Sequence, residues 1–523
     1  MLAEAIRHRP LFAAVASGVL LVFSFPKFGV GALAWVALVP LLLSLPQGSF
    51  AVGFLSGLAA GFVAELGLLY WIAYVVVTYG FIPLPLGIIA AVAVAAYLSL
   101  YWGLFGGALS WLGGSGAPRI LVAPVLFTSL EFAKSQLLTG FPWENLGHSQ
   151  YLYPVLTQIA DTTGVYGITF MIVMVNAALA DCLDPAKRID RRFLYRELAA
   201  VAALLAGVAG YGALRLAQLE RLLGNAERMA VTLSQGNIDQ SVKWDPFYQY
   251  ATIAAYRSIS PPAQGKGPCL LVWPETAVPC YFQEDGKLRD EVLDIVRASG
   301  SYVLFGSPAY DGCWPTATYF NSAYLLSPAG DVLGRYDKVH LVPYGEYVPL
   351  RRFLPFLSKI VVGIGDLGTG KGFVPLTMGT HRLGTLICYE AIFPEAGRSY
   401  KTAGADLLVN ITNDAWFGRT SAPWQHLSMT VFRAIENRLY LVRAANTGVS
   451  AIIDPVGRII AHTALFERTA LRGEVRFIHM ETFYARRGDV FVMLCLATLA
   501  VLILDVIWRR RRSNAGRNRR VAV

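Results

Sequence analysis

Charged residues are scarce in this chain of 523 residues. They make up 15% of it, while hydrophobic residues make up 55%. A soluble globular domain usually has about 45–50% apolar residues, so this composition excludes a single soluble globule. Basic residues outnumber acidic ones, 45 to 35, which gives a formal net charge of +10. We attribute this excess to membrane topology and attraction to a membrane surface, and we expect no nucleic-acid partner.

Cysteine is also rare, with six residues whose spacing forms no disulfide framework. No C-x-x-C motif or Cys/His spacing indicates zinc, so we expect neither a metal nor another cofactor. Four cysteines (Cys269, Cys280, Cys313 and Cys388) fall in a region where a disulfide is chemically allowed. Their spacing leaves open whether any two of them pair. The sequence also has no internal repeat and no low-complexity segment.

The hydrophobic residues are concentrated in eight runs. A membrane crossing takes about 20 residues, so each run is a candidate span, and we predict a helical bundle of about eight spans. The runs cover residues 10–25, 28–46, 50–78, 84–112, 119–138, 164–183, 197–217 and 489–508. No small-residue cleavage site follows the first run, so we interpret it as a span and not as a signal peptide.

Three basic clusters orient the predicted bundle, because basic residues favour the cytoplasmic side of a membrane. They are Arg7 with Arg9, residues 187–192 and residues 509–512. Eight spans that start from a cytoplasmic N-terminus place all three clusters in the cytoplasm. We therefore predict seven spans in 1–217, an extracytoplasmic domain in 218–488, and a final span with a basic tail in 489–523.

The predicted outer domain has a different sequence pattern, in which short apolar runs alternate with amphipathic stretches. The apolar runs, which we interpret as buried strands, are 230–233, 270–273, 302–305, 322–326, 385–388, 406–412, 440–444 and 449–453. The amphipathic stretches are 245–260, 286–299, 391–403 and 425–438. This alternation indicates a layered α/β domain with helices packed on sheet.

Cys388 stands at the end of one predicted strand, directly before a helix start with a proline in its first turn. A nucleophile at such a turn projects outward, and the backbone N–H groups after it, beginning with that of Tyr389, can bind an oxyanion. A cysteine taken alone is far more often a small buried hydrophobic residue. Upstream, Glu275 supplies a carboxylate and Lys338 an ammonium. Taken alone, Glu275 is equally well explained as a charge at a helix N-terminus, and Lys338 as a surface lysine.

These three residues occur in motifs that resemble the nitrilase (carbon–nitrogen hydrolase) superfamily. The motifs are Trp-Pro-Glu at 273–275, Tyr-Asp-Lys at 336–338 and Cys-Tyr-Glu at 388–390, with further blocks at 410–414 and 433–438. The resemblance implies an αββα sandwich in which Cys388 is the nucleophile, Glu275 the general base and Lys338 the cation that favours thiolate and oxyanion. It implies that Glu346 orients Lys338 or holds the tetrahedral intermediate. Glu390 is as readily structural as functional.

Other motifs resemble the apolipoprotein N-acyltransferase family of the bacterial inner membrane. They are Thr-Gly-Phe-Pro-Trp at 139–143, Gln-Gly-Asn-Ile at 235–238 and the segment 343–349. This resemblance covers nearly the whole chain. It implies acyl transfer from a phospholipid to the diacylglyceryl-cysteine of an apolipoprotein, through a thioester on Cys388, with the catalytic domain in the periplasm. We expect a monomer. One departure is Glu-Phe-Ala-Lys at 131–134, where lysine replaces the arginine expected and the guanidinium fork is lost.

Loop aromatics are candidates for lipid contact, because aromatic side chains anchor proteins at membrane interfaces. The candidates are Trp143, Trp244, Trp416 and Phe417, with Asn413 beside them. Local packing explains them equally well. The apolar segment 353–364 is a better candidate for membrane contact.

Glu65, Glu131 and Lys134 are charged residues inside predicted spans, where a charge needs a partner or a function. Glu131 and Lys134 are three residues apart on a helix and can pair with each other. A structural ion pair explains them as well as substrate contact does, and the role of Glu65 stays open. His148 and His426 have no metal-like company in the sequence, and we interpret both as ordinary residues.

Two other functions fit part of the pattern. A membrane-tethered amidase or nitrilase would use the same triad with water as the acceptor, although water-soluble substrates would not need so many spans. A transporter or receptor with a sensing domain would need no nucleophile, and replacement of Cys388 by alanine would then be harmless.

The orientation of the bundle gives the first testable prediction. A reporter fused after Gly224 should be active outside the cytoplasm, because all three basic clusters fall on the opposite side. Activity of a cytoplasmic reporter at this point would overturn both the orientation and the assignment to lipoproteins.

Overall fold

The computed structural model describes residues 9–113, 117–184, 191–263, 269–313, 315–348 and 366–521. The predicted membrane-contact segment 353–364 lies outside these residues. The chain separates into two compact units. The first unit contains Met1–Tyr70, Ile88–Ala213 and Asp489–Val523, and the second contains Trp71–Gly87 and Leu214–Gly488.

The first unit is a helical bundle. Its longer helices are α2 (Pro10–Ser24), α5 (Phe50–Leu69), α7 (Leu84–Leu112), α8 (Arg119–Gln136), α11 (Val165–Leu183), α12 (Arg191–Gly224) and α18 (Val490–Val521). Glycines bring α5 and α7 close together, since a Cβ on Gly57 would lie 2.1 Å from the carbonyl oxygen of Trp102. Small residues commonly allow such close approach between membrane helices.

Six of the described helices, not eight, are long and apolar enough to cross a membrane. They cover Phe50–Leu69, Leu84–Leu112, Arg119–Thr139, Val165–Leu183, Leu194–Gly224 and Val490–Arg512. The predicted span 10–25 gives the 15-residue helix α2, shorter than the roughly 20 residues that a crossing needs. The prediction of eight spans was therefore wrong, because an apolar composition does not guarantee a continuous helix.

Two predicted spans are interrupted. Residues 28–46 form only the short helices η1 (Gly31–Leu33), α3 (Ala34–Ala37) and α4 (Val39–Ser44). A proline in the first turn of α4 marks the break, because proline has no N–H to continue the preceding helix. The run 50–78 is divided near Tyr70, after which α6 (Trp71–Gly80) forms part of the second unit.

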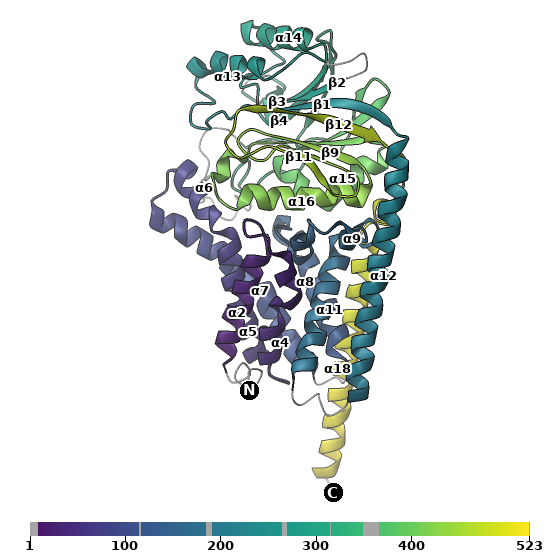
Figure 1. Cartoon of the computed structure of the whole chain (residues 1–523). Helices are drawn as coiled ribbons and strands as arrows, with labels where there is room; N and C mark the ends of the chain where they lie inside the picture. Colours follow the sequence, from purple (N-terminus) through teal and green to yellow (C-terminus); the bar gives the residue numbers. More distant parts are fainter. Residues whose placement is uncertain are drawn as a thin grey trace. The chain divides into compact units, whose positions relative to one another are not determined.

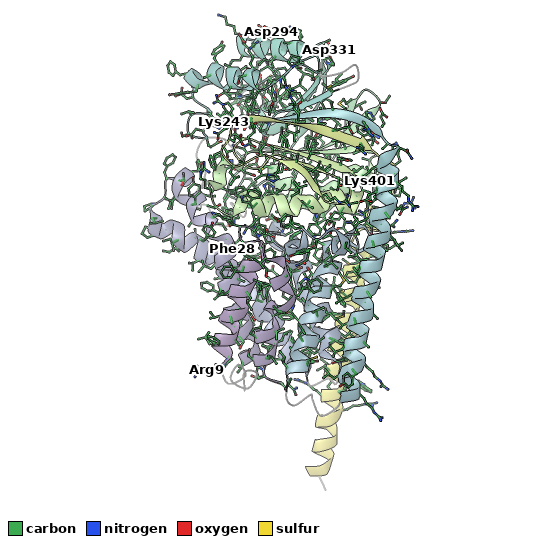
Figure 2. The ribbon with its side chains drawn as sticks, in the orientation of Figure 1. Arg9, Phe28, Lys243, Asp294, Asp331 and Lys401 are labelled. Carbon is green, nitrogen blue, oxygen red and sulfur yellow. The ribbon has the colours of Figure 1, made fainter. Side chains whose placement is uncertain are left out.

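The second unit contains two six-stranded sheets covered by helices. The first sheet has the order β12-β1-β2-β3-β4-β5 and the second the order β11-β10-β9-β8-β7-β6. Helices α13 (Pro246–Ser258) and α14 (Lys287–Ser299) cover the outer face of the first sheet, and α15 (Pro394–Thr402) and α16 (Ala422–Asn437) cover that of the second (Figure 1). The exposed face of α14 carries charges such as Asp294 (Figure 2). These four layers are the expected αββα sandwich.

The strands of the sandwich are as follows. The first sheet contains β1 (Glu227–Gln235), β2 (Cys269–Val272), β3 (Tyr302–Asp311), β4 (Thr318–Leu326), β5 (Val332–Asp337) and β12 (Thr469–Phe477). The second contains β6 (Leu376–Met378), β7 (His381–Ile387), β8 (Leu407–Thr412), β9 (Tyr440–Ala445), β10 (Ala451–Ile453) and β11 (Ile459–His462). The apolar runs in the sequence predicted all eight inner strands and missed the four edge strands β5, β6, β11 and β12.

Four candidate site residues lie just after the carboxyl ends of strands. Strands β2 and β3 run parallel, as do β7, β8 and β9. Glu275, Lys338, Cys388 and Asn413 follow the ends of β2, β5, β7 and β8 within three residues. Carboxyl ends of strands are where loops gather chemically active side chains in α/β folds.

Candidate active site

Cys388 lies at a sharp turn between β7 and the short helix η6 (Cys388–Ile392). Its φ angle is +52°, in the left-handed region that a non-glycine residue rarely adopts. Such a conformation costs roughly 1–3 kcal/mol and persists only where the surroundings hold it. The side chain is 8% exposed. The turn expected after β7 is therefore present, with strained backbone at the cysteine.

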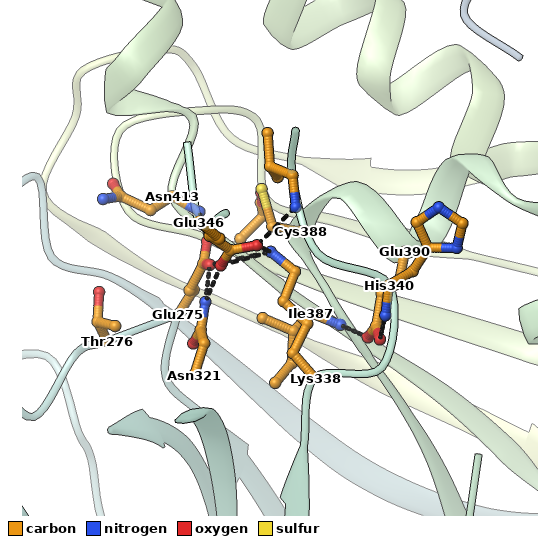
Figure 3. A network of polar contacts seen from close by, with 12 residues as sticks. Glu275, Thr276, Asn321, Lys338, His340, Glu346, Ile387, Cys388, Glu390 and Asn413 are labelled. Carbon is orange, nitrogen blue, oxygen red and sulfur yellow. Dashed lines mark hydrogen bonds and ion pairs between the residues drawn. The ribbon is translucent and has the colours of Figure 1, made fainter. Parts of the chain in front are cut away.

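Glu390 holds this turn to the segment that carries Lys338. Its Oε2 accepts a hydrogen bond of 2.7 Å from the Ile387 N–H. Its Oε1 accepts from the Tyr336 hydroxyl at 2.8 Å and from the N–H groups of Val339 at 2.7 Å and His340 at 3.1 Å (Figure 3). Burial raises the pKa of Glu390 to about 7 despite these donors. The carboxyl group thus has a clear structural role, which is to tie the two segments together.

Lys338 is 1% exposed and lies between two carboxylates. Its Nζ is 2.9 Å from Glu346 Oε2 and 3.9 Å from Glu275 Oε1. Burial alone would lower the pKa of Lys338, but the charges of Glu346 and Glu275 outweigh it and hold the pKa above its ordinary value. The lysine is therefore an ammonium group in the resting site. Asn321 connects the carboxylates, since its Nδ2 donates to Glu275 Oε1 at 2.7 Å and to Glu346 Oε1 at 2.9 Å.

Glu275 lies in a turn after β2. The next helix, α14, begins only at Lys287, so the explanation of Glu275 as a helix N-terminal charge was wrong. Its Oε2 accepts from the Asn413 N–H at 2.8 Å. The turn itself is held by the buried Lys243 (Figure 2), whose Nζ donates to the Glu275 carbonyl oxygen at 3.1 Å and to Thr276 Oγ1 at 2.5 Å.

Asn321 and Lys243 were not predicted from the sequence, because an isolated amide or lysine carries no motif. Burial lowers the pKa of Lys243 to about 8, although Glu275 opposes this. The tight packing around the turn also depends on Gly306, where a Cβ would lie 2.7 Å from Glu275 Cα.

The thiol of Cys388 is protonated in the resting site. Burial raises its pKa, Glu275 raises it further, and Lys338 opposes both. Figure 3 shows Cys388 beside Glu275, Glu346 and Lys338. A neutral thiol beside a carboxylate and an ammonium has a proton acceptor and a cation at hand, the two requirements for nucleophilic attack on a carbonyl carbon.

A second buried charge cluster lies behind the cysteine. His426 Nε2 is 3.1 Å from the carbonyl oxygen of Cys388, and His426 Nδ1 is 3.1 Å from Asp414 Oδ1 and 3.0 Å from Arg443 Nη2. Arg443 Nη2 also donates to Asp414 Oδ2 at 2.7 Å. His426, interpreted from the sequence as an ordinary residue without metal-like company, belongs to this buried cluster. A signal was present, since Arg443 places a charge in the middle of the buried strand β9.

The candidate lipid-contact residues differ in exposure. Trp143 is buried in the first unit, and Asn413 is buried in the second. Trp416 and Phe417, in the short helix η7 (Asp414–Phe417), are half-buried against α6, with ring centroids 4.8 Å from Tyr79 and 4.9 Å from Trp71, respectively. Trp244 is 38% exposed. Local packing thus accounts for part of the surface of both η7 aromatics.

The charged residues of the bundle hold a loop in place. Glu131 accepts hydrogen bonds from the Leu146 N–H at 2.5 Å and the Thr169 hydroxyl at 2.8 Å, while Lys134 Nζ donates to the Trp143 carbonyl oxygen at 3.3 Å. Glu65 accepts from Trp102 Nε1 at 3.1 Å. These three charged side chains line a cavity of about 30 Å³ in the first unit, room for one or two waters.

Among the described residues, no group of three or more histidine, cysteine, aspartate or glutamate side chains is arranged to hold a metal ion.

The sandwich and its buried Glu-Lys-Cys cluster define a domain of the carbon–nitrogen hydrolase type, joined to a membrane bundle. A profile of the carbon–nitrogen hydrolase family matches residues 219–481, and one of the apolipoprotein N-acyltransferase N-terminal domain matches residues 17–178. The apolipoprotein N-acyltransferase of Geobacter metallireducens is 46% identical, and that of Methylococcus capsulatus is 33% identical; each comparison covers 97% of both chains. The chain belongs to the apolipoprotein N-acyltransferase family, a class of multi-pass membrane acyltransferases.

Solved structures with a similar domain are more distant. A nitrilase-superfamily protein of Saccharomyces cerevisiae is 18% identical, with a TM-score of 0.37 over 50% of this chain and 94% of that one. A carbon–nitrogen hydrolase of Helicobacter pylori is 17% identical, with a TM-score of 0.34 over 51% of this chain and 93% of that one.

The cluster behind the cysteine gives a prediction about pH and stability. Burial disfavours ionisation of Asp414, but Arg443 and His426 more than offset this and lower its pKa to about 2, from an ordinary 3.8. A lowered carboxyl pKa stabilises the fold above the ordinary value, and this stabilisation is lost as the pH falls through the folded value. This shift of nearly two pKa units corresponds to about 2–3 kcal/mol.

We therefore expect the free energy of unfolding of the detergent-solubilised protein to fall between about pH 4 and pH 2. An Asp414→Asn variant should have a lower but flatter profile over this interval, measured by denaturant titration. Asp294→Asn, a change at an exposed aspartate, is the matched control and should follow the wild type. Parallel profiles for Asp414→Asn and wild type would contradict the role of Asp414.

Proposed function

We propose that this protein transfers an acyl chain from a phospholipid to the α-amine of the N-terminal diacylglyceryl-cysteine of an apolipoprotein, through a thioester on Cys388. The observation that carries the proposal is the buried cluster of Cys388, Lys338 and Glu275 at the strand ends of the sandwich, in a chain of this family. A thioester suits the transfer because an amine attacks it readily.

The first half-reaction forms the thioester. Glu275 takes the thiol proton as Cys388 Sγ attacks the ester carbonyl carbon of the phospholipid. The negative charge that develops on the carbonyl oxygen is stabilised by the Lys338 ammonium and the Tyr389 N–H. Collapse of this intermediate breaks the ester C–O bond, Glu275 returns the proton to the leaving oxygen, and lysophospholipid departs.

The second half-reaction forms the amide. The neutral α-amine of the lipoprotein attacks the thioester carbonyl carbon, and Glu275 takes a proton from the nitrogen. The C–S bond then breaks, and the cysteine recovers a proton from Glu275. Glu346 accompanies both steps as the partner of Lys338, at 2.9 Å, and keeps its ammonium charged and oriented.

The catalytic domain, in this proposal, faces the periplasm of a bacterial inner membrane. Reducing the spans from eight to six leaves an even number, so both chain ends stay on one side. Five of the six spans precede the sandwich, which keeps it on the side opposite the basic clusters at 187–192 and 509–512. The family, whose members act on lipoproteins by name, supports this arrangement.

Lipid contact, in the same proposal, falls to Trp244, Trp416 and Phe417, whose rings are at least partly exposed. Trp143 and Asn413 are buried and would have structural roles. Asn413 donates a hydrogen bond to Glu275 and so holds the general base. Trp143 lies in the loop to which Lys134 is hydrogen-bonded. We propose that the acyl donor and the acceptor occupy the site in turn and that one copy of the chain is sufficient.

The nucleophile assignment is tested by supplying phospholipid without an acceptor. A fatty-acyl mass increment should appear on the peptide that contains Cys388, measured by intact-mass analysis and peptide mapping. Cys388→Ala should abolish the increment and turnover, and Cys388→Ser should nearly do so, because a hydroxyl is much less acidic than a thiol. Cys280→Ala, a change at another cysteine of the same domain, should behave as the wild type.

An acyl increment on another cysteine would overturn the assignment. Addition of a diacylglyceryl peptide with a free α-amine should discharge the thioester into acylated peptide. Discharge into free fatty acid instead, at the same rate with and without the peptide, would favour a hydrolase that uses water as the acceptor.

The role of Glu275 is tested separately. Glu275→Gln keeps the size of the side chain but cannot accept the thiol proton, so thioester formation should fall by at least about 100-fold, within the range for general-base catalysis. The exposed Glu284, changed to glutamine, is the matched control. Thioester formation at the normal rate in Glu275→Gln would assign the proton transfer to another group, with Glu346 as the next candidate.

A further inference from the structure

His426 contacts the backbone of the cysteine and not its thiol. Its Nε2 lies 3.1 Å from the carbonyl oxygen of Cys388, on the short helix η6. A carbonyl oxygen only accepts hydrogen bonds, so Nε2 carries the hydrogen in this contact. The other ring nitrogen, Nδ1, lies 3.0 Å from Arg443 Nη2, a donor, and 3.1 Å from Asp414 Oδ1, an acceptor. The hydrogen on Nε2 is therefore assigned from the Cys388 carbonyl oxygen.

The histidine is itself fixed in place. It is 1% exposed, on the buried helix α16. Asp414 and Arg443, a buried ion pair at 2.7 Å, contact its other ring nitrogen. Burial and Arg443 lower the pKa of His426, while the charge and the hydrogen bond of Asp414 oppose them. The donor that reaches Cys388 is therefore rigid and keeps one direction.

The carbonyl group that His426 binds belongs to the same planar peptide unit as the Tyr389 N–H. In a trans peptide the C=O and N–H bonds point in opposite directions, so fixing one fixes the other. The Cys388 φ of +52° is a strained conformation. Such a conformation persists only where surrounding groups hold the backbone in place. Glu390 holds the peptide unit between Leu386 and Ile387 through the Ile387 N–H at 2.7 Å. The peptide after the cysteine is held by His426.

We propose that His426 is a positioning residue for the oxyanion donor: its hydrogen bond to the Cys388 carbonyl oxygen aims and polarises the Tyr389 N–H toward the substrate oxygen. A hydrogen bond accepted by the C=O end of a peptide unit strengthens the donor at its N–H end. This inference rests on the proposed function, because it assigns His426 to the oxyanion that forms during attack on an ester or thioester.

Two reactions of Cys388 should depend differently on the His426 hydrogen bond. Acylation by phospholipid passes through an oxyanion, whereas alkylation by iodoacetamide displaces iodide from carbon without forming one. Loss of the His426 hydrogen bond should therefore slow acylation much more than alkylation. A general loss of structure around Cys388 would slow both.

The experiment uses the full chain in phospholipid nanodiscs, with both rates measured by mass spectrometry of the Cys388 peptide. His426→Leu should slow acylation about 30- to 100-fold, toward the loss seen when one oxyanion donor is removed, and should change alkylation by no more than about threefold. His426→Gln keeps an N–H near the position of Nε2 and should recover most of the acylation rate. Leu427→Ala, a core truncation at the next residue of α16, controls for weakened packing and should affect the two reactions equally.

The outcomes of this experiment support or overturn the role of His426 as follows. Selective loss of acylation in His426→Leu, with recovery in His426→Gln, supports the proposal. Equal slowing of both reactions, or no slowing, overturns it. Failure of His426→Gln to recover any acylation also overturns it, since the hydrogen bond would then not be the cause. Absence of acyl-enzyme in the wild type would overturn the proposed function itself, and this inference with it.

Discussion

The burial of one ammonium group is the constraint on which the site depends. Lys338 is almost fully enclosed, and an unpaired charge in such a place would be strongly destabilising. Glu346 and Glu275 offset this cost, and Asn321 holds both carboxylates by its amide group. Burial raises the pKa of the Cys388 thiol, Glu275 raises it further, and Lys338 opposes both. Glu275 and Lys338 therefore contribute both to the burial of the site and to the resting state of the nucleophile.

In the sandwich, the thiol, the ammonium and the Glu275 carboxylate each lie near the end of a strand. Residues far apart in the chain, such as Glu275 and Cys388, follow strands of different sheets and meet because the two sheets pack face to face. Buried polar side chains then fix the loops that follow. Glu390 joins the segments after β5 and β7, Lys243 holds the turn at Glu275, and His426 holds the peptide after the cysteine. Each is fully enclosed, so its hydrogen bonds are costly to break.

Prediction of the fold from the sequence succeeded where elements are buried on both sides and failed where they are not. The eight inner strands were visible as apolar runs, and the four helices of the sandwich as amphipathic stretches. The edge strands β5, β6, β11 and β12 were missed, because an edge strand needs no continuous apolar run. The bundle shows the converse error. Residues 28–46 are apolar enough for a span, but composition does not report the break before α4.

The sequence by itself determined the division into an apolar bundle and a layered α/β domain, because hydrophobic runs are local properties of the chain. The αββα class and the candidate residues Glu275, Lys338 and Cys388 came from motifs that resemble the carbon–nitrogen hydrolase superfamily. Only the tertiary structure decided which buried groups complete the site. Asn321, Lys243 and His426 stand alone in the sequence, and each has meaning only through an atom contributed by a distant segment. A hydrogen bond of about 3 Å is set by the packing of strands and helices, and no local pattern encodes that distance.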